Sequence, residues 1–159
     1  NFIDKNYNIY NKTYIIKLIR LCISKQERNQ QDFTIALIKI DHWKFNLFAL
    51  NLKNKITKET AKAIRGNIRL VDELGHVGGG VFCLIMPETG LSNANIALNR
   101  IRKLTLKQLN IFIPLKDKRF SLKVSLLGYP KDAEVINHIL DSQAIPDFLE
   151  DNCVKTADL

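Results

Sequence analysis

The stretch HVGGGVFCLIMPE, residues 76–88, places three consecutive glycines between two apolar segments. A tight hairpin turn needs one or two residues with positive φ, and glycine supplies that backbone conformation without steric cost. We therefore predict a β-hairpin whose strands are residues 72–77 and 81–86, with Pro87 ending the second strand. A third glycine adds conformational entropy to the unfolded chain and makes no contacts, so its presence needs a further explanation.

The remainder of the chain predicts four helices and three further strands. The run FTIALIKI is nearly continuous in apolar residues and rich in isoleucine, which is typical of a buried central strand. Four other segments repeat apolar residues close to the 3.6-residue period of an amphipathic helix. The predicted helices are residues 12–26, 51–68, 92–109 (with Ser92 or Asn93 as the N-cap) and 131–141, and the predicted strands are residues 33–40, 111–115 and 120–127.

The order of these elements predicts an α/β (α+β) fold. The hairpin and the strand of residues 33–40 would form one mainly antiparallel sheet with helices packed on it, a sandwich of the ferredoxin-like kind. No internal repeat or linker separates the elements, so we expect one domain over residues 1–147 and a loosely ordered tail over residues 148–159. Because the chain begins with Asn1 rather than Met, we expect it to be a piece of a longer protein.

The composition is that of a globular domain with a basic surface. Of the 159 residues, 46% are hydrophobic and 25% are charged, which is enough apolar material for a core. The formal net charge of +8 suits anionic partners such as nucleic acid, nucleotides or a membrane surface. The lysines are scattered, and no basic run is interleaved with aromatic residues, so we expect no dedicated nucleic-acid binding.

The cysteines and histidines indicate neither a disulfide framework nor a metal site. Cys22, Cys83 and Cys153 are odd in number and far apart, which favours a reducing cytosol. The histidines have no metal-ligand spacing with them. We therefore predict no metal, no resident cofactor and a cytoplasmic location, with any tether to the inner membrane in segments outside this chain.

Four stretches of the chain resemble, in the right order, the GGDEF domain of bacterial diguanylate cyclases, which condense two GTP molecules into cyclic di-GMP. The family motifs are D-x-L-T-G-L-x-N-R-x-x-F, LLDxDxFK, R-x-G-G-D-E-F-x-x-x-x-P-x-T and S-x-G-x-x-x-x-P. The corresponding stretches here are DKNYNIYNKTYI (residues 4–15), FTIALIKIDHWKF (33–45), HVGGGVFCLIMPET (76–89) and SLKVSLLGYPKDA (121–133). The resemblance implies the palm-like fold that the family shares with nucleotidyl cyclases.

The resemblance also implies that the signature loop is degenerate. Gly78 and Gly79 match the two signature glycines, which let the backbone approach the phosphates of GTP. Gly80 stands where the family has an aspartate or glutamate, Val81 stands where it has a glutamate, and Phe82 matches its phenylalanine. The third glycine is therefore interpreted as the remnant of a lost acid.

Other positions of the family's catalytic site have changed as well. The metal-binding aspartate at the end of the first strand corresponds to Lys39, and only Asp41 of that motif remains acidic. The asparagine that reads guanine and the aspartate after it correspond to Leu47 and Phe48. Phosphoryl transfer of this type needs two carboxylates to hold magnesium and to activate the 3′ hydroxyl. Lys39 and Gly80 cannot supply them, so we predict a regulatory pseudo-enzyme without cyclase activity.

A second family site, which binds the product, is marked by R-x-x-D before the signature glycines. Arg69-Leu70-Val71-Asp72 fits this motif, with Asp72 six positions before Gly78 (78 − 72 = 6). A guanidinium matches guanine O6 and N7 bidentately, and a carboxylate can accept from the guanine N1–H and N2–H₂ edge. The family often completes this site with an arginine from the next helix, where Arg100 stands with Arg102 nearby.

Two functional hypotheses follow from these residues. In the first, the chain is a signalling receptor that binds cyclic di-GMP through Arg69 and Asp72 and passes occupancy to other domains or to a signalling partner. In the second, it is a ligand-free scaffold for homodimerisation or protein docking, since an Arg–Asp pair three residues apart is also an ordinary surface pair. We also expect Trp43 to pack, and His76, which replaces a family arginine, to be a solvated strand residue.

Overall fold

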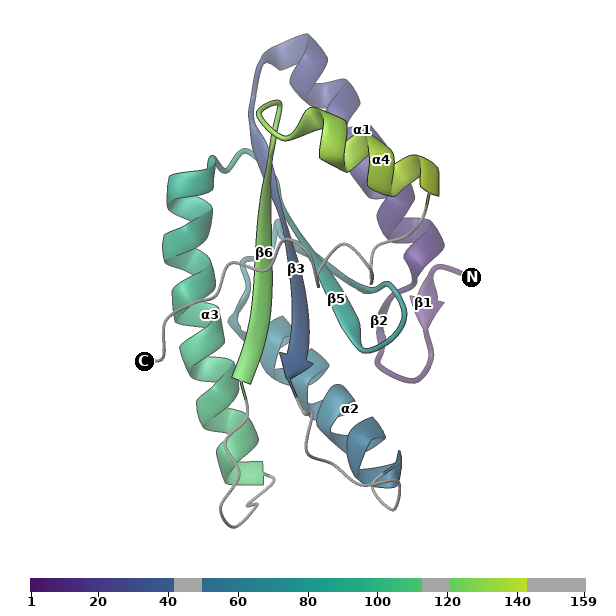
Figure 1. Ribbon diagram of the computed structural model, residues 1–159, viewed down its shortest axis with the longest axis vertical. Helices are drawn as coiled ribbons and strands as arrows, with labels where there is room; N and C mark the ends of the chain where they lie inside the picture. The colour runs from purple at the N-terminus through teal and green to yellow at the C-terminus, as the bar shows by residue number, and fades with distance from the viewer. Residues whose placement is uncertain (42–49, 113–120, 143–159) are drawn as a thin grey trace.

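The computed structural model describes residues 1–41, 50–112 and 121–142 as a sheet between two helical layers (Figure 1). No helix in these ranges is both long enough and apolar enough to cross a membrane. In chain order the elements are β1 (Ile3–Asp4), β2 (Ile9–Tyr10), α1 (Lys12–Asn29), β3 (Phe33–Asp41), α2 (Leu50–Asn67), β4 (Glu73–His76), β5 (Val81–Met86), α3 (Leu91–Phe112), β6 (Ser121–Tyr129) and α4 (Ala133–Ser142).

The six strands form one sheet in the order β1-β2-β4-β5-β3-β6. Neighbouring strands are antiparallel except β2 and β4, which are parallel. The isoleucine-rich strand β3 lies between β5 and β6, and Leu37 at its middle pairs with Cys83 on one side and Ser125 on the other. The predicted hairpin, its central neighbour and the mainly antiparallel sheet are therefore confirmed.

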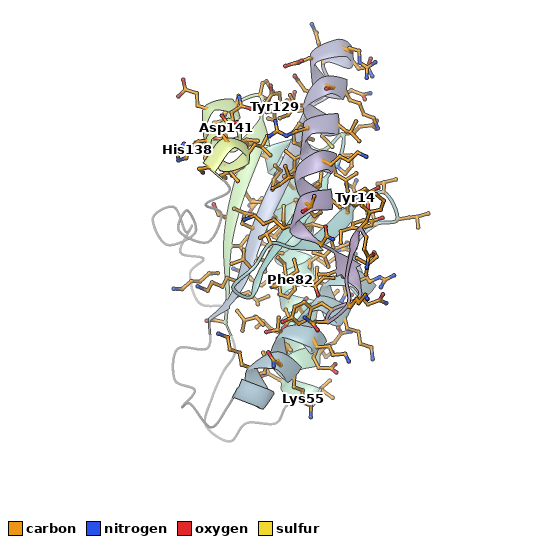
Figure 2. All side chains as sticks on the ribbon, turned by 90° about the vertical axis from the view of Figure 1, so that its right-hand side faces the viewer. Tyr14, Lys55, Phe82, Tyr129, His138 and Asp141 are labelled. Carbon is orange, nitrogen blue, oxygen red and sulfur yellow. The ribbon has the colours of Figure 1, made fainter. Side chains whose placement is uncertain are left out.

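Helices cover both faces of the sheet, and each face has its own core. Because side chains alternate along a strand, Ala36 and Ile38 of β3 lie in different clusters from Ile35 and Leu37. The first cluster joins α2 and α3 to the sheet, and the second joins α1 and α4 to it. Phe82 of β5 is fully buried in the first cluster and lies near the centre of the molecule (Figure 2).

The four predicted helices are confirmed, with corrections at the boundaries. α3 begins at Leu91, and the N–H of Ala94 donates to the carbonyl of Gly90, so the prediction of Ser92 or Asn93 as N-cap is wrong. The predicted strand of residues 111–115 is also wrong at Ile111 and Phe112. These two residues continue α3, because its helical spacing of apolar residues extends that far.

Two short strands near the N-terminus were not predicted. β1 and β2 have two residues each, and the intervening turn is polar, so neither has the length that a period of two needs for recognition. They extend the sheet beyond β4, where Tyr10 pairs with Gly75. Residues 113–115 and the predicted tail of residues 148–159 lie outside the described residues.

Candidate functional site

The three glycines of the signature loop all have positive φ. The φ values are 102° for Gly78, 59° for Gly79 and 74° for Gly80. A Cβ atom at any of the three would meet no heavy atom within 4 Å, so backbone conformation alone disfavours larger residues. The positive φ at Gly80 therefore explains the third glycine, which the sequence had not indicated.

Beside this loop, β3 and β5 bring Lys39 directly opposite Val81. Val81 is fully buried in the second core cluster, and Lys39 is half-buried. A lysine ammonium, a glycine and an aliphatic side chain thus occupy neighbouring positions. None of these side chains has an oxygen atom with which to ligate a hard divalent cation.

Other residues predicted around the signature loop are only partly described by the structure. Asp41 ends β3 opposite Ser121, but its side chain is outside the described part of the structure. The same holds for residues 42–49, so the expectations for Trp43, Leu47 and Phe48 stay predictions. Within residues 1–41, 50–112 and 121–142, no group of three or more His, Cys, Asp or Glu side chains is placed to hold a metal ion.

The R-x-x-D motif forms a tight turn between α2 and β4, at the end of β4 that is remote from the signature loop. The N–H of Asp72 donates to the carbonyl of Arg69 at 3.1 Å. The Asp72 carboxylate accepts from the Arg69 backbone N–H at 2.9 Å and from its Nη2 at 2.7 Å. The side chain of Asp72 is 3% exposed, whereas that of Arg69 is 48% exposed.

Thr89 completes the support of the Arg69 guanidinium. Arg69 Nη2 also donates to Thr89 Oγ1 at 2.8 Å, and this hydroxyl donates to the carbonyl of Pro87 at 2.8 Å. The hydrogen bonds to Asp72 raise the pKa of Arg69. A permanently charged guanidinium is therefore held in one plane by a buried carboxylate and a hydroxyl, on a side chain that is about half exposed.

This geometry changes the role predicted for Asp72. Both carboxylate oxygens already accept hydrogen bonds from Arg69, and the carboxylate is almost fully buried. In this arrangement Asp72 positions Arg69, and it does not offer its oxygens to a guanine edge.

Arg69 separates two surface hollows. One has a volume of about 460 Å³ and lies against α1, with Lys25 and Glu88 on its walls. The other has a volume of about 580 Å³ and lies beside β2, with Arg65 on its wall. Glu73 lines both, and burial raises the pKa of its carboxyl against an opposing hydrogen bond from Tyr10.

The two arginines of α3 do not share a surface. Arg100 is exposed, and its Nη2 donates to the carbonyl of Asn67 at 3.4 Å, close in sequence to Arg69. Arg102 is only 8% exposed and lies about 200° further round the helix. The structure therefore brings Arg100 to the R-x-x-D end of the molecule and leaves Arg102 out of that surface.

His76, just before the signature loop, is not the solvated residue that was predicted. Its Nδ1 lies 3.0 Å from Asp4 Oδ2, and only 13% of its side chain is exposed. The rings of Tyr7 and Phe82 pack against it at centroid distances of 4.6 and 5.8 Å. The prediction is wrong because the N-terminal strands, which the sequence did not reveal, cover this part of β4.

With this geometry in place, comparison with known families is decisive. The family model described as "Diguanylate cyclase, GGDEF domain" matches residues 1–142. The chain belongs to the GGDEF domain family.

Solved GGDEF structures share the fold of this GGDEF domain at low sequence identity. The GGDEF domain of FimX from Pseudomonas aeruginosa superposes with a TM-score of 0.69 at 16% identity, covering 92% of this chain and 95% of that one. The GGDEF domain of DgcB from Caulobacter crescentus, solved in complex with c-di-GMP, gives 0.70 at 15% identity, covering 91% of each chain. The mixed α+β palm fold expected from the sequence is therefore confirmed.

A third structure is longer than this GGDEF domain. Diguanylate cyclase SiaD from Pseudomonas aeruginosa, in complex with its activator SiaC, gives a TM-score of 0.72 at 18% identity over 91% of this chain. The present chain spans 59% of the SiaD chain.

Two site residues of this GGDEF domain were missed from the sequence, although both lie in quoted motifs. Thr89 is the threonine of P-x-T, and Asp4 is the aspartate that opens the first motif. Their partners, Arg69 and His76, are far away in sequence. The family motifs include Thr89 and Asp4, but only the fold shows which residue each of them contacts.

Proposed function

We propose that this GGDEF domain is a catalytically inactive receptor that binds cyclic di-GMP through the turn containing Arg69 and Asp72. The observation that carries the receptor role is the Arg69 side chain, which is 48% exposed although Asp72 and Thr89 fix its guanidinium. A cation whose plane is already fixed loses little conformational entropy when it binds a planar partner.

The loss of catalysis is supported by the side chains beside the signature loop. Lys39 corresponds to the family's metal-binding aspartate, and Gly80 to its loop acid. Magnesium prefers oxygen ligands. Lys39 carries a positive charge instead, and Gly80 has no side chain. The residues present do not fit the metal ions on which the family's reaction depends.

The product site is supported by complementary chemistry. Asp72 and Thr89 engage Nε and Nη2 of Arg69, so among the described residues Nη1 is the group left to donate to guanine O6 or N7. Lys25 and Arg65, on the walls of the two adjoining hollows, supply positive charge for the phosphodiesters of the ligand. Asp72 acts as a positioning residue, because its oxygens are occupied by Arg69.

A cyclase assay tests the loss of catalysis. Incubated with GTP and either Mg²⁺ or Mn²⁺, the wild-type chain should form no cyclic di-GMP. The double variant Gly80→Asp/Val81→Glu should also be inactive, because Lys39 still stands where the first metal ligand belongs. Turnover by the wild type that disappears in Asp41→Ala would overturn the inactive assignment.

Thermal denaturation tests the receptor role. A ligand that binds the native state raises the melting temperature, and the rise increases with the logarithm of its concentration relative to its Kd. Cyclic di-GMP should therefore raise it, and cyclic di-AMP, whose adenine edge has a different donor pattern, should raise it less. An equal response to both dinucleotides would contradict guanine recognition.

A second candidate, protein docking through the same turn, is supported by the two central residues of the motif. Leu70 is fully exposed and Val71 is 58% exposed, which is unusual for adjacent large aliphatic side chains. If the thermal response to both dinucleotides is absent, docking through this turn becomes the better proposal.

A further inference from the structure

Helix α3 carries aliphatic side chains on its solvent face. Ile96 is 68% exposed, Leu104 is 37% exposed and Ile111 is 65% exposed. Their spacing of eight and seven residues puts them in one stripe, opposite the buried Leu98. A surface helix normally has polar residues at these positions, so the stripe is not explained by the core that α3 covers.

The same stripe is strongly basic. Lys103 and Lys107 are exposed and lie between the aliphatic side chains, within an arc about 100° wide. The sequence of α3, Leu91–Phe112, contains no aspartate or glutamate. No carboxylate on this helix therefore offsets the lysine charges.

Helix α2 extends this charge across the same helical layer. Lys55, Lys58 and Lys62 are exposed on its outer side, while Ile56 and Ile64 are buried against the sheet. Figure 2 shows Lys55 near one end of the molecule, far from His138 and Asp141 of α4. The one acidic residue of α2, Glu59, is half-buried. We use the name basic face for Lys55, Lys58, Lys62, Lys103 and Lys107 together with Ile96, Leu104 and Ile111.

We propose that the basic face docks on an anionic lipid bilayer. Lysines attract acidic headgroups, and exposed aliphatic side chains among them can enter the boundary between headgroups and acyl chains. A second copy meeting the same face would bring like charges together. Single-stranded nucleic acid is recognised largely by stacking on aromatic rings, and the exposed apolar residues of the basic face are aliphatic.

Sedimentation with vesicles tests this proposal and needs no cyclic di-GMP. The full chain should sediment with vesicles of phosphatidylglycerol and phosphatidylethanolamine in equal parts, and much less with vesicles of phosphatidylcholine. Lys103→Glu/Lys107→Glu should lower the partition coefficient about thirtyfold or more, because each lysine near an anionic bilayer adds to the free energy of binding. Ile96→Ser/Ile111→Ser should lower it about tenfold and leave the net charge unchanged.

A charge-matched variant on the opposite helical layer is the control. Lys17→Glu/Arg20→Glu on α1 changes the net charge equally and should lower the partition coefficient less than about threefold. Circular dichroism should show all variants folded, since every substituted side chain is exposed. The proposal fails if wild type does not sediment with the anionic vesicles, or if the control loses as much as the α3 variants. It also fails if Lys103→Glu/Lys107→Glu abolishes binding to a DNA duplex but leaves sedimentation with the anionic vesicles unchanged.

Discussion

At the scale of single residues, backbone conformation decides which residue types fit in the signature loop. The sequence predicted positive φ for one or two glycines, but Gly78, Gly79 and Gly80 all have it. A pattern of letters cannot indicate this, because φ at each position depends on how β4 and β5 are joined. Gly80 was interpreted as the remnant of a lost acid, and its positive φ is a second reason for a glycine at this position.

A pair of glycine substitutions measures this constraint. Gly80→Ala should lower the free energy of unfolding by about 1–2 kcal/mol, because φ is 74° there. Gly66→Ala, in α2 with open space at the Cβ position, should raise it by about 0.5–1 kcal/mol. Urea denaturation of both variants gives the comparison. A neutral or stabilising Gly80→Ala would mean that the loop has another conformation.

The R-x-x-D motif brings Arg69 and Asp72 into contact with each other, which the motif alone does not indicate. The resemblance to the family's motif pointed to Arg69 and Asp72, and the structure pairs them closely. It also buries the carboxylate under the guanidinium, which a linear motif does not reveal. Thr89 enters the same group because the hairpin brings the end of β5 beside the turn.

At the scale of elements, long periodic segments were predictable and short ones were not. The apolar run of β3 indicated a central strand and that of β5 a hairpin strand, and both are buried on both faces. β1 and β2 depend on tertiary pairing with β4, so nothing in their own residues indicated strands. The end of α3 was predicted as strand because its last apolar residues fit either period.

Strand β5 should protect its thiol from chemical labelling. Cys83 is fully buried, and burial raises its pKa to about 12 from 9.0. Between pH 9 and 12 the thiol of the unfolded chain ionises while the native thiol stays protonated. The free energy of unfolding therefore falls as the pH rises through this range. With iodoacetamide at pH 8, mass spectrometry should find Cys22 modified long before Cys83. Rapid labelling of Cys83 in native protein would contradict the buried strand.

Strand β3 should be the element least tolerant of truncation. Leu37 is 1% exposed at the centre of the sheet, so Leu37→Ala should lower the free energy of unfolding by about 2–5 kcal/mol. Lys53→Ala, on the exposed part of α2, should change it by less than about 0.5 kcal/mol. Chemical denaturation provides both values. Similar effects for the two variants would place β3 outside the core.

At the scale of the whole molecule, the fold separates two sites by the length of β4. The signature loop lies at one end of this strand, and the Arg69 turn lies at the other. A change at Lys39 or Gly80 therefore need not alter the geometry of the Arg69 turn. A chain that has lost the cyclase chemistry can retain a product site, and this separation is what makes a receptor physically reasonable.

Isothermal titration calorimetry with cyclic di-GMP tests the receptor role most directly. The wild-type chain should bind with measurable heat, and Arg69→Ala should lose a guanine contact worth about 1–3 kcal/mol, or about one to two orders of magnitude in affinity. Arg20→Ala, an exposed arginine on α1, should bind like wild type. Asp72→Asn should weaken binding less than Arg69→Ala, because it only loosens the position of Arg69. No heat with wild type at ligand concentrations near a millimolar, or equal affinity for wild type and Arg69→Ala, would contradict a cyclic di-GMP site at this turn.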